Sequence, residues 1–163
     1  MKTLIVYSSK SGNTKKLAEA IYGFLPGENT LKPVEEAPDP AGYDLIIAGF
    51  WLQGGKADSL SSQYLATLDS VKLFLFATHG AAVDSDHAEN GMQSAKTLAQ
   101  PCDIVGEFHC QGEVKAEFLA KVQAQNPQPP WVKDAPNAVG HPSESDISRL
   151  QDVLHDTIEK ISV

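Results

Sequence analysis

The chain has 163 residues, of which 42% are hydrophobic and 21% are charged, so its composition is that of a globular domain and not of a disordered segment. This length suits one α/β domain with a sizeable core. The formal net charge of -8 argues against nucleic acids and anionic membranes as partners, and it favours a docking partner with a basic patch.

The cysteines and the N-terminus limit the protein class further. Cys102 and Cys110 cannot make a disulfide framework, and no Cys/His cluster has the spacing of a zinc site. The N-terminal apolar run is too short for a signal peptide or a membrane span. We therefore expect a cytoplasmic protein without a metal site.

The first element is a short apolar run, Thr3 to Tyr7, which predicts a buried strand. A helix is expected from about Asn13 to Leu25, ended by Pro26-Gly27. The turn between them, Ser9 to Thr14, consists almost entirely of Ser, Thr, Asn and Gly. A capped helix needs only one such residue. Backbone N–H groups at a helix start, the helix dipole and several hydroxyls together indicate a phosphate site.

This turn does not match the G-x-x-x-x-G-K-(S/T) or G-x-G-x-x-G nucleotide motifs. It resembles the flavodoxin family, whose loop for the phosphate of flavin mononucleotide (FMN) has the form (S/T)-x-(S/T)-G-N-T. The resemblance implies FMN as the cofactor. The matching positions, which it implies as phosphate-binding residues, are Ser9, Lys10, Ser11, Gly12, Asn13 and Thr14.

The elements that follow alternate between strands and helices. A short strand within Asn29–Val34 is expected at a sheet edge, because Pro33 cannot donate a ladder hydrogen bond. The other expected strands are Tyr43–Phe50, Val71–Ala77 and Asp103–Cys110, and the expected helices are Ser59–Leu68 and Ala88–Ala99. An insertion at about residues 111–142, with a possible helix at Val114–Gln125, precedes a last helix that Ser143 caps.

Strands that alternate with helices imply right-handed crossovers and a parallel sheet covered on both faces. We predict an α/β fold with a doubly wound five-stranded parallel sheet of order 2-1-3-4-5, a flavodoxin-like three-layer sandwich in which residues 1–163 form a single domain. In such sheets, ligands bind beyond the carboxyl ends of the strands. The turns after the first, third and fourth strands all emerge at that edge.

In flavodoxins the flavin ring lies between the two loops that follow the third and fourth strands. Trp51 can stack on the ring or pack in the core. The Gly54-Gly55 peptide can turn its carbonyl toward N5 of the flavin, or it can form an ordinary turn. The cofactor-binding positions that the resemblance implies are Phe50, Trp51, Leu52, Gly54 and Gly55 in the first loop, and Thr78, His79 and Gly80 in the second.

The second loop lacks the Tyr that many flavodoxins stack on the outer face of the flavin. His79 can contact the pyrimidine edge or cover the ring, or it can be structural. The acidic residues Asp84, Asp86 and Glu89 on the loop rim form either a docking surface for a basic partner or a solvated loop.

Two functions are consistent with these features. The first is an FMN-binding electron-transfer flavoprotein that passes electrons between a reductase and a redox enzyme. The alternative is an FMN-dependent NAD(P)H reductase acting on quinones or other small oxidants, which the missing Tyr favours. A phosphoacceptor receiver domain and a small tyrosine phosphatase are excluded because their acidic residues and C-x5-R loop are absent. No acid–base pair or nucleophile stands out, so no catalytic residue is assigned.

Overall fold

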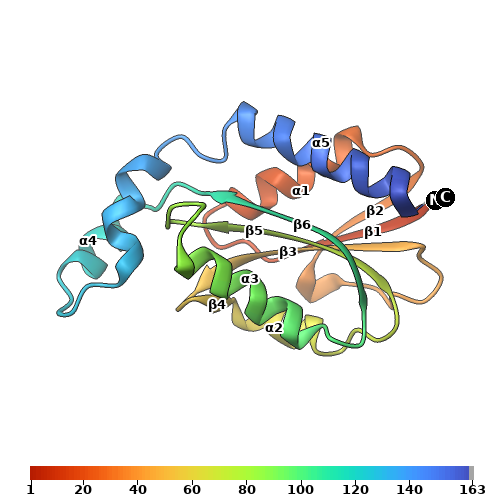
Figure 1. Ribbon diagram of the computed structural model, residues 1–163, viewed down its shortest axis with the longest axis horizontal. Helices are drawn as coiled ribbons and strands as arrows, with labels where there is room; N and C mark the ends of the chain where they lie inside the picture. Colours follow the sequence, from red (N-terminus) through yellow and green to blue (C-terminus); the bar gives the residue numbers. More distant parts are fainter. Residues whose placement is uncertain (162–163) are drawn as a thin grey trace.

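The computed structural model describes residues 1–161, which form a parallel sheet with helices on both faces (Figure 1). Five strands run parallel in the order β2-β1-β3-β5-β6, and β4 pairs antiparallel with the end of β3. The strands are β1 Lys2–Tyr7, β2 Glu28–Pro33, β3 Leu45–Gln53, β4 Lys56–Ala57, β5 Lys72–His79 and β6 Asp103–Gln111. The predicted α/β class and strand order are confirmed.

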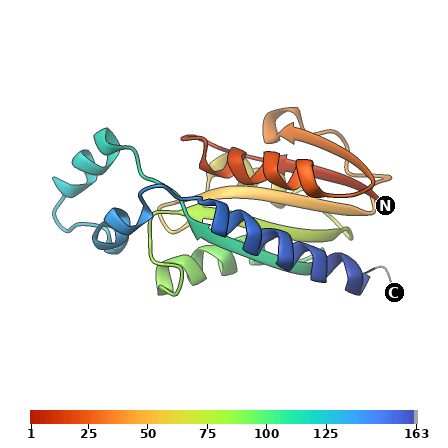
Figure 2. The same cartoon turned by 90° about the horizontal axis from the view of Figure 1, so that it is seen from above.

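Helices cover both faces of the sheet as two outer layers (Figures 1 and 2). α1 Asn13–Phe24 and α5 Glu144–Ile161 lie on one face, and α2 Ser59–Leu65 and α3 Asp86–Leu98 lie on the other. Within residues 1–161, no helix is long and apolar enough to cross a membrane.

The sheet separates two hydrophobic cores. Successive strand residues alternate between the two faces, so Ile46 packs toward α3 while Ile47 packs toward α1 and α5. Because both faces are covered, the strands read as the continuous apolar runs seen in the sequence. Helical spacing predicts Leu60 on the inner face of the helix at Ser59–Leu68, but Leu60 is 43% exposed, because Ser61 and Leu65 form the buried face of α2.

Two strands extend further than the sequence predicts. β3 continues to Gln53 because β4 folds back on it, and β5 continues to His79 because it pairs with β6 as far as Gln111. Pairing with a neighbouring strand decides these ends, and for β5 that strand lies about 30 residues further along the chain. Four residues predicted in loops are therefore strand residues: Trp51, Leu52, Thr78 and His79.

The insertion (residues 112–142) lies beyond the carboxyl ends of the strands, opposite the N-terminus (Figure 1). It contains α4 Ala116–Gln123, within the expected range Val114–Gln125, and a 3-10 segment, Pro130–Ala138. α4 and the 3-10 segment pack on each other. The insertion thus stands at the sheet edge where ligands of this architecture bind.

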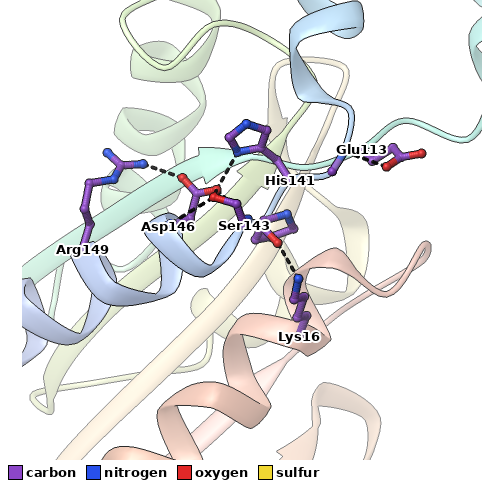
Figure 3. Close-up of polar contacts among 8 residues, drawn as sticks. Lys16, Glu113, His141, Ser143, Asp146 and Arg149 are labelled. Atoms are coloured by element: carbon purple, nitrogen blue, oxygen red, sulfur yellow. Dashed lines mark hydrogen bonds and ion pairs between the residues drawn. The ribbon is translucent and has the colours of Figure 1, made fainter.

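The two ends of the insertion are held together beside α1 and α5 (Figure 3). The Glu113 N–H donates to the His141 carbonyl at 2.8 Å, and the Gly140 N–H donates to the Glu113 carboxylate at 2.8 Å. Lys16 Nζ of α1 donates to the Pro142 carbonyl at 2.6 Å. The two ends of the insertion are therefore hydrogen-bonded to each other and to α1.

Asp146 lies at the centre of these contacts (Figure 3). Its carboxylate accepts hydrogen bonds from the Ser143 N–H at 2.7 Å, from Arg149 at 2.6 Å and from His141 Nδ1. Ser143 Oγ in turn accepts from the Asp146 N–H at 3.3 Å, which makes Ser143 the predicted helix cap. Burial alone would raise the pKa of Asp146, but the hydrogen bonds outweigh it and lower the pKa to about 2.

Gly49 on β3 is predicted to be intolerant of any side chain, because an added Cβ would lie 2.1 Å from the buried ring of Phe76. We expect Gly49→Ala to lower the free energy of unfolding by roughly 1–3 kcal/mol, measured by urea denaturation. Combining it with Phe76→Leu should cost less than the sum of the two single changes. Gly23→Ala in α1, where a Cβ meets nothing within 4 Å, should instead be neutral or stabilising by up to about 1 kcal/mol. Equal losses at both glycines would contradict this packing.

Asp146 should make stability depend on pH in the acidic range. Its folded pKa lies below the ordinary value of 3.8, so the carboxylate stabilises the folded state at neutral pH and loses this effect as the pH falls toward 2. We expect Asp146→Asn to lower the free energy of unfolding by about 1–2 kcal/mol at pH 7. The gap between parent and variant in urea unfolding should narrow below about pH 4. Asp152→Asn, exposed on the same helix, is the matched control. A gap that is constant with pH would refute this role.

Candidate functional site

A cavity of about 690 Å³ opens beside the N-terminus of α1, at the carboxyl ends of β1 and β3. Ser9, Lys10, Gly12 and Lys15 line it from the turn after β1 and the start of α1. Trp51 lines it from β3. The predicted phosphate turn and the predicted ring-stacking residue therefore share one cavity.

The start of α1, beside this cavity, holds unpaired backbone donors. Gly12 has a φ of 97°, a left-handed conformation that favours glycine, and its N–H donates to Ser9 Oγ at 3.2 Å. Among the described residues, the N–H groups of Asn13, Thr14 and Lys15 have no hydrogen-bond acceptor. With the positive end of the α1 dipole, these donors suit an anion.

The side chains of Asn13 and Thr14 bind the protein itself. Thr14 Oγ1 is buried, 2.9 Å from Thr78 Oγ1 and 3.4 Å from the Phe50 carbonyl. Asn13 Nδ2 donates to the Glu113 carbonyl at 2.9 Å. These two side chains hold the turn in place, and what they present to a ligand is their backbone N–H groups. The side chains of Lys10 and Ser11 are exposed, and that of Ser9 is half-buried.

Of the three predicted ring residues on β3, Trp51 alone lines the cavity. Phe50 is fully buried in the core on the α3 side. Leu52 packs against α3 so closely that a Cβ at Gly91 would come within 2.6 Å of it. Phe50 and Leu52, which the resemblance implied as cofactor-binding positions, direct their side chains into the core because of the alternation along β3.

The Gly54-Gly55 pair connects β3 and β4 as a two-residue hairpin turn. Both residues have positive φ, 60° and 77°, as the tight turns that match strand twist require. Asp58 braces the end of this hairpin: its N–H donates to the Trp51 carbonyl at 3.0 Å, and its carboxylate accepts from the Ser61 N–H of α2 at 3.1 Å. Sequence reasoning missed Asp58, although an Asp directly before a helix is a capping signal.

Thr78 and His79, which the resemblance implied as cofactor-binding positions, are buried within β5. Neither residue lines the cavity. His79 Nδ1 lies 3.0 Å from the Ala81 carbonyl and must donate to it, so Nε2 accepts from His109 Nδ1 at 3.0 Å. Burial, and next the neighbouring His109, lower the pKa of His79 to about 4. His79 therefore has the structural role, since both its ring nitrogens have partners inside the protein.

Two aromatic residues of the insertion, Phe118 and Trp131, form a stacked pair near the phosphate turn. Sequence reasoning missed both residues. Lys10 Nζ lies 5.6 Å from the ring centroid of Trp51 and 5.9 Å from that of Phe118. Phe118 stacks on Trp131 with centroids 6.3 Å apart and an interplanar angle of 7°. The one signal in the sequence was that the insertion follows a strand whose carboxyl end lies at the ligand edge.

Cys110 is fully buried, and burial raises the pKa of its thiol to about 12. Among residues 1–161, no three His, Cys, Asp or Glu side chains gather closely enough to hold a metal ion.

Sequence comparison finds flavodoxin relatives. A family model described as a flavodoxin domain matches residues 4–155. The flavodoxin-like domain-containing protein BilS of Clostridioides difficile (strain CD3) is 33% identical over 74% of this chain and 72% of its own length. BilS of Clostridium symbiosum (strain WAL-14163) is 29% identical over 94% of each chain.

Solved structures share the fold. A flavodoxin from the domain Archaea matches with a TM-score of 0.63 at 15% identity, over 100% of both chains. A flavoprotein of Lactobacillus acidophilus NCFM, solved in complex with FMN, matches with a TM-score of 0.56 at 20% identity, over 66% of this chain and 92% of that one. Together with the domain match over residues 4–155, these findings place this chain in the flavodoxin family.

Proposed function

We propose that this protein binds FMN and carries electrons between a reductase and a redox enzyme. The observation that carries the proposal is the group of free N–H donors at the start of α1, within a flavodoxin-type turn whose residues Ser9, Lys10 and Gly12 line the same cavity as Trp51. Membership of the flavodoxin family supports FMN as the ligand, and so does the FMN-bound flavoprotein of L. acidophilus as a structural neighbour.

The donor set fits a phosphomonoester. The N–H groups of Asn13, Thr14 and Lys15 can each donate to a phosphate oxygen, and the hydroxyls of Ser9 and Ser11 add donors. A Cβ at Gly12 would contact nothing within 4 Å, so an anion can approach its backbone. Lys10 and Lys15 line the cavity and balance the charge of a phosphate without a metal ion.

The residues on β3 and β4 suit the flat part of the ligand. The bound flavin would supply the redox chemistry, and the protein would hold it and tune its potential. Trp51 provides an aromatic face for stacking, fixed by its backbone bond with Asp58. The Gly54-Gly55 turn can present its carbonyl in either direction, because both glycines tolerate positive φ.

The charge distribution supports a carrier rather than an NAD(P)H reductase. The lysines that line the cavity, Lys10 and Lys15, both flank the phosphate turn, so the cavity lining offers no further cation for a nicotinamide dinucleotide. Asp84, Asp86 and Glu89 are exposed around the start of α3 and suit a partner with a basic patch. Cys110 and His79 are buried and do not line the cavity.

A single added charge can test whether this turn binds the phosphate of FMN. Ser11→Asp adds a negative charge to an exposed residue before α1, which suits the helix dipole but repels a phosphate. We expect the FMN dissociation constant, from flavin fluorescence titration, to rise by roughly tenfold or more, while riboflavin binding changes little. Ser148→Asp, exposed on α5, is the control. A parent protein that retains no FMN after desalting would refute the proposal.

Anaerobic reduction of the FMN-loaded protein distinguishes carrier from enzyme. We expect two separable one-electron steps in the visible spectrum, because a carrier must exchange single electrons with its partners. We also expect no steady NAD(P)H oxidation with a quinone unless a reductase is added. Steady turnover by the protein alone would establish the reductase alternative instead.

A further inference from the structure

Three aromatic rings from distant parts of the chain meet at the phosphate turn. Trp51 comes from β3, and Phe118 and Trp131 come from the insertion. The ammonium group of Lys10 lies over the rings of both Trp51 and Phe118, at 5.6 and 5.9 Å from their centroids. These two rings therefore face a common space, which Lys10 fills.

Trp131 is seated firmly on the second loop. A Cβ at Gly80 would lie 3.0 Å from Trp131 Cε3, so the absence of a side chain at Gly80 makes room for the indole. Asp134, one turn further, accepts the Ala82 N–H at 3.1 Å and a bond from Gln111 Nε2 at 3.4 Å. Trp131 thus occupies the loop after β5, which itself carries no aromatic residue between Gly80 and His87.

The space at Lys10 has the dimensions of a stacking site. Stacked aromatic rings have centroids about 4.5–7 Å apart. Lys10 Nζ lies within that range of both rings, so it stands where a flat ring in contact with Trp51 and Phe118 would lie. A lysine on an exposed turn is long and flexible, and it can withdraw toward a phosphate bound at the same turn.

We infer that Phe118, backed by Trp131, forms the second aromatic wall of the flavin site, opposite Trp51, and that the insertion supplies it in place of a loop aromatic. The inference rests on the proposed FMN binding. It explains why Phe118 is 49% exposed and yet stacked. Gly80 takes part as the residue that admits Trp131.

The test separates contacts to the ring from contacts to the phosphate. FMN and riboflavin are titrated into the full-length parent, Phe118→Ala and Trp131→Leu proteins, and flavin fluorescence and visible circular dichroism are followed. We expect both dissociation constants to rise by a similar factor, roughly tenfold, with less quenching of the flavin. Phe118→Tyr should restore both readouts, because it restores the ring. Tyr22→Ala, which removes another 49%-exposed aromatic on α1, should change neither.

Each outcome decides between the two levels of proposal. If the parent binds FMN and Phe118→Ala binds both flavins with parental affinity and quenching, the second wall does not exist and the proposed function stands. If the parent binds neither flavin, the proposed function fails and the inference with it. Phe118 is exposed, so its variant reports on binding even if Trp131→Leu disturbs the insertion; thermal unfolding of each variant checks this.

Discussion

The site depends on a constraint of every helix: the first backbone N–H groups have no acceptor within the helix. At the start of α1, neither side chains nor neighbouring backbone satisfy those of Asn13, Thr14 and Lys15. Gly12 adopts a left-handed conformation directly before the helix, and it has no side chain that could block these N–H groups. An anion is the partner that such donors lack, which is why this turn decides the chemistry of the cavity.

Rigidity of the turn comes from the side chains that sequence reasoning assigned to the ligand. Thr14 reaches across to Thr78 and the Phe50 carbonyl, and Asn13 reaches the Glu113 carbonyl. Since these bonds join α1, β3, β5 and the segment after β6, the donors are preorganised before any ligand arrives. Preorganisation lowers the cost of ordering groups on binding. The Thr14 hydroxyl and the Asn13 amide therefore hold the turn in position through hydrogen bonds inside the protein.

The insertion turns a common fold into a particular site. Its base is fixed by Glu113, Lys16 and the hydrogen bonds around Asp146, and its aromatic pair reaches back over the phosphate turn. A loop of this length would ordinarily be mobile and would lose entropy on closing over a ligand. Ties at both ends reduce that loss. The same ties let residues more than 100 positions from the turn belong to its surroundings.

The sequence by itself determined the α/β class, the strand order and the phosphate turn, because alternating buried strands and helices leave few topologies and the turn residues are contiguous. Tertiary structure decided the rest. Strand pairing extended β3 and β5. Because side chains alternate along β3, those of Phe50 and Leu52 pack in the core, whereas that of Trp51 lines the cavity. The His79 ring bonds to His109, and the Asp58 N–H bonds to the Trp51 carbonyl at the hairpin. Phe118, stacked on Trp131, lies beside Lys10. The contacts of His79 with His109 and of Lys10 with Phe118 join residues distant in sequence, so no local pattern could specify them.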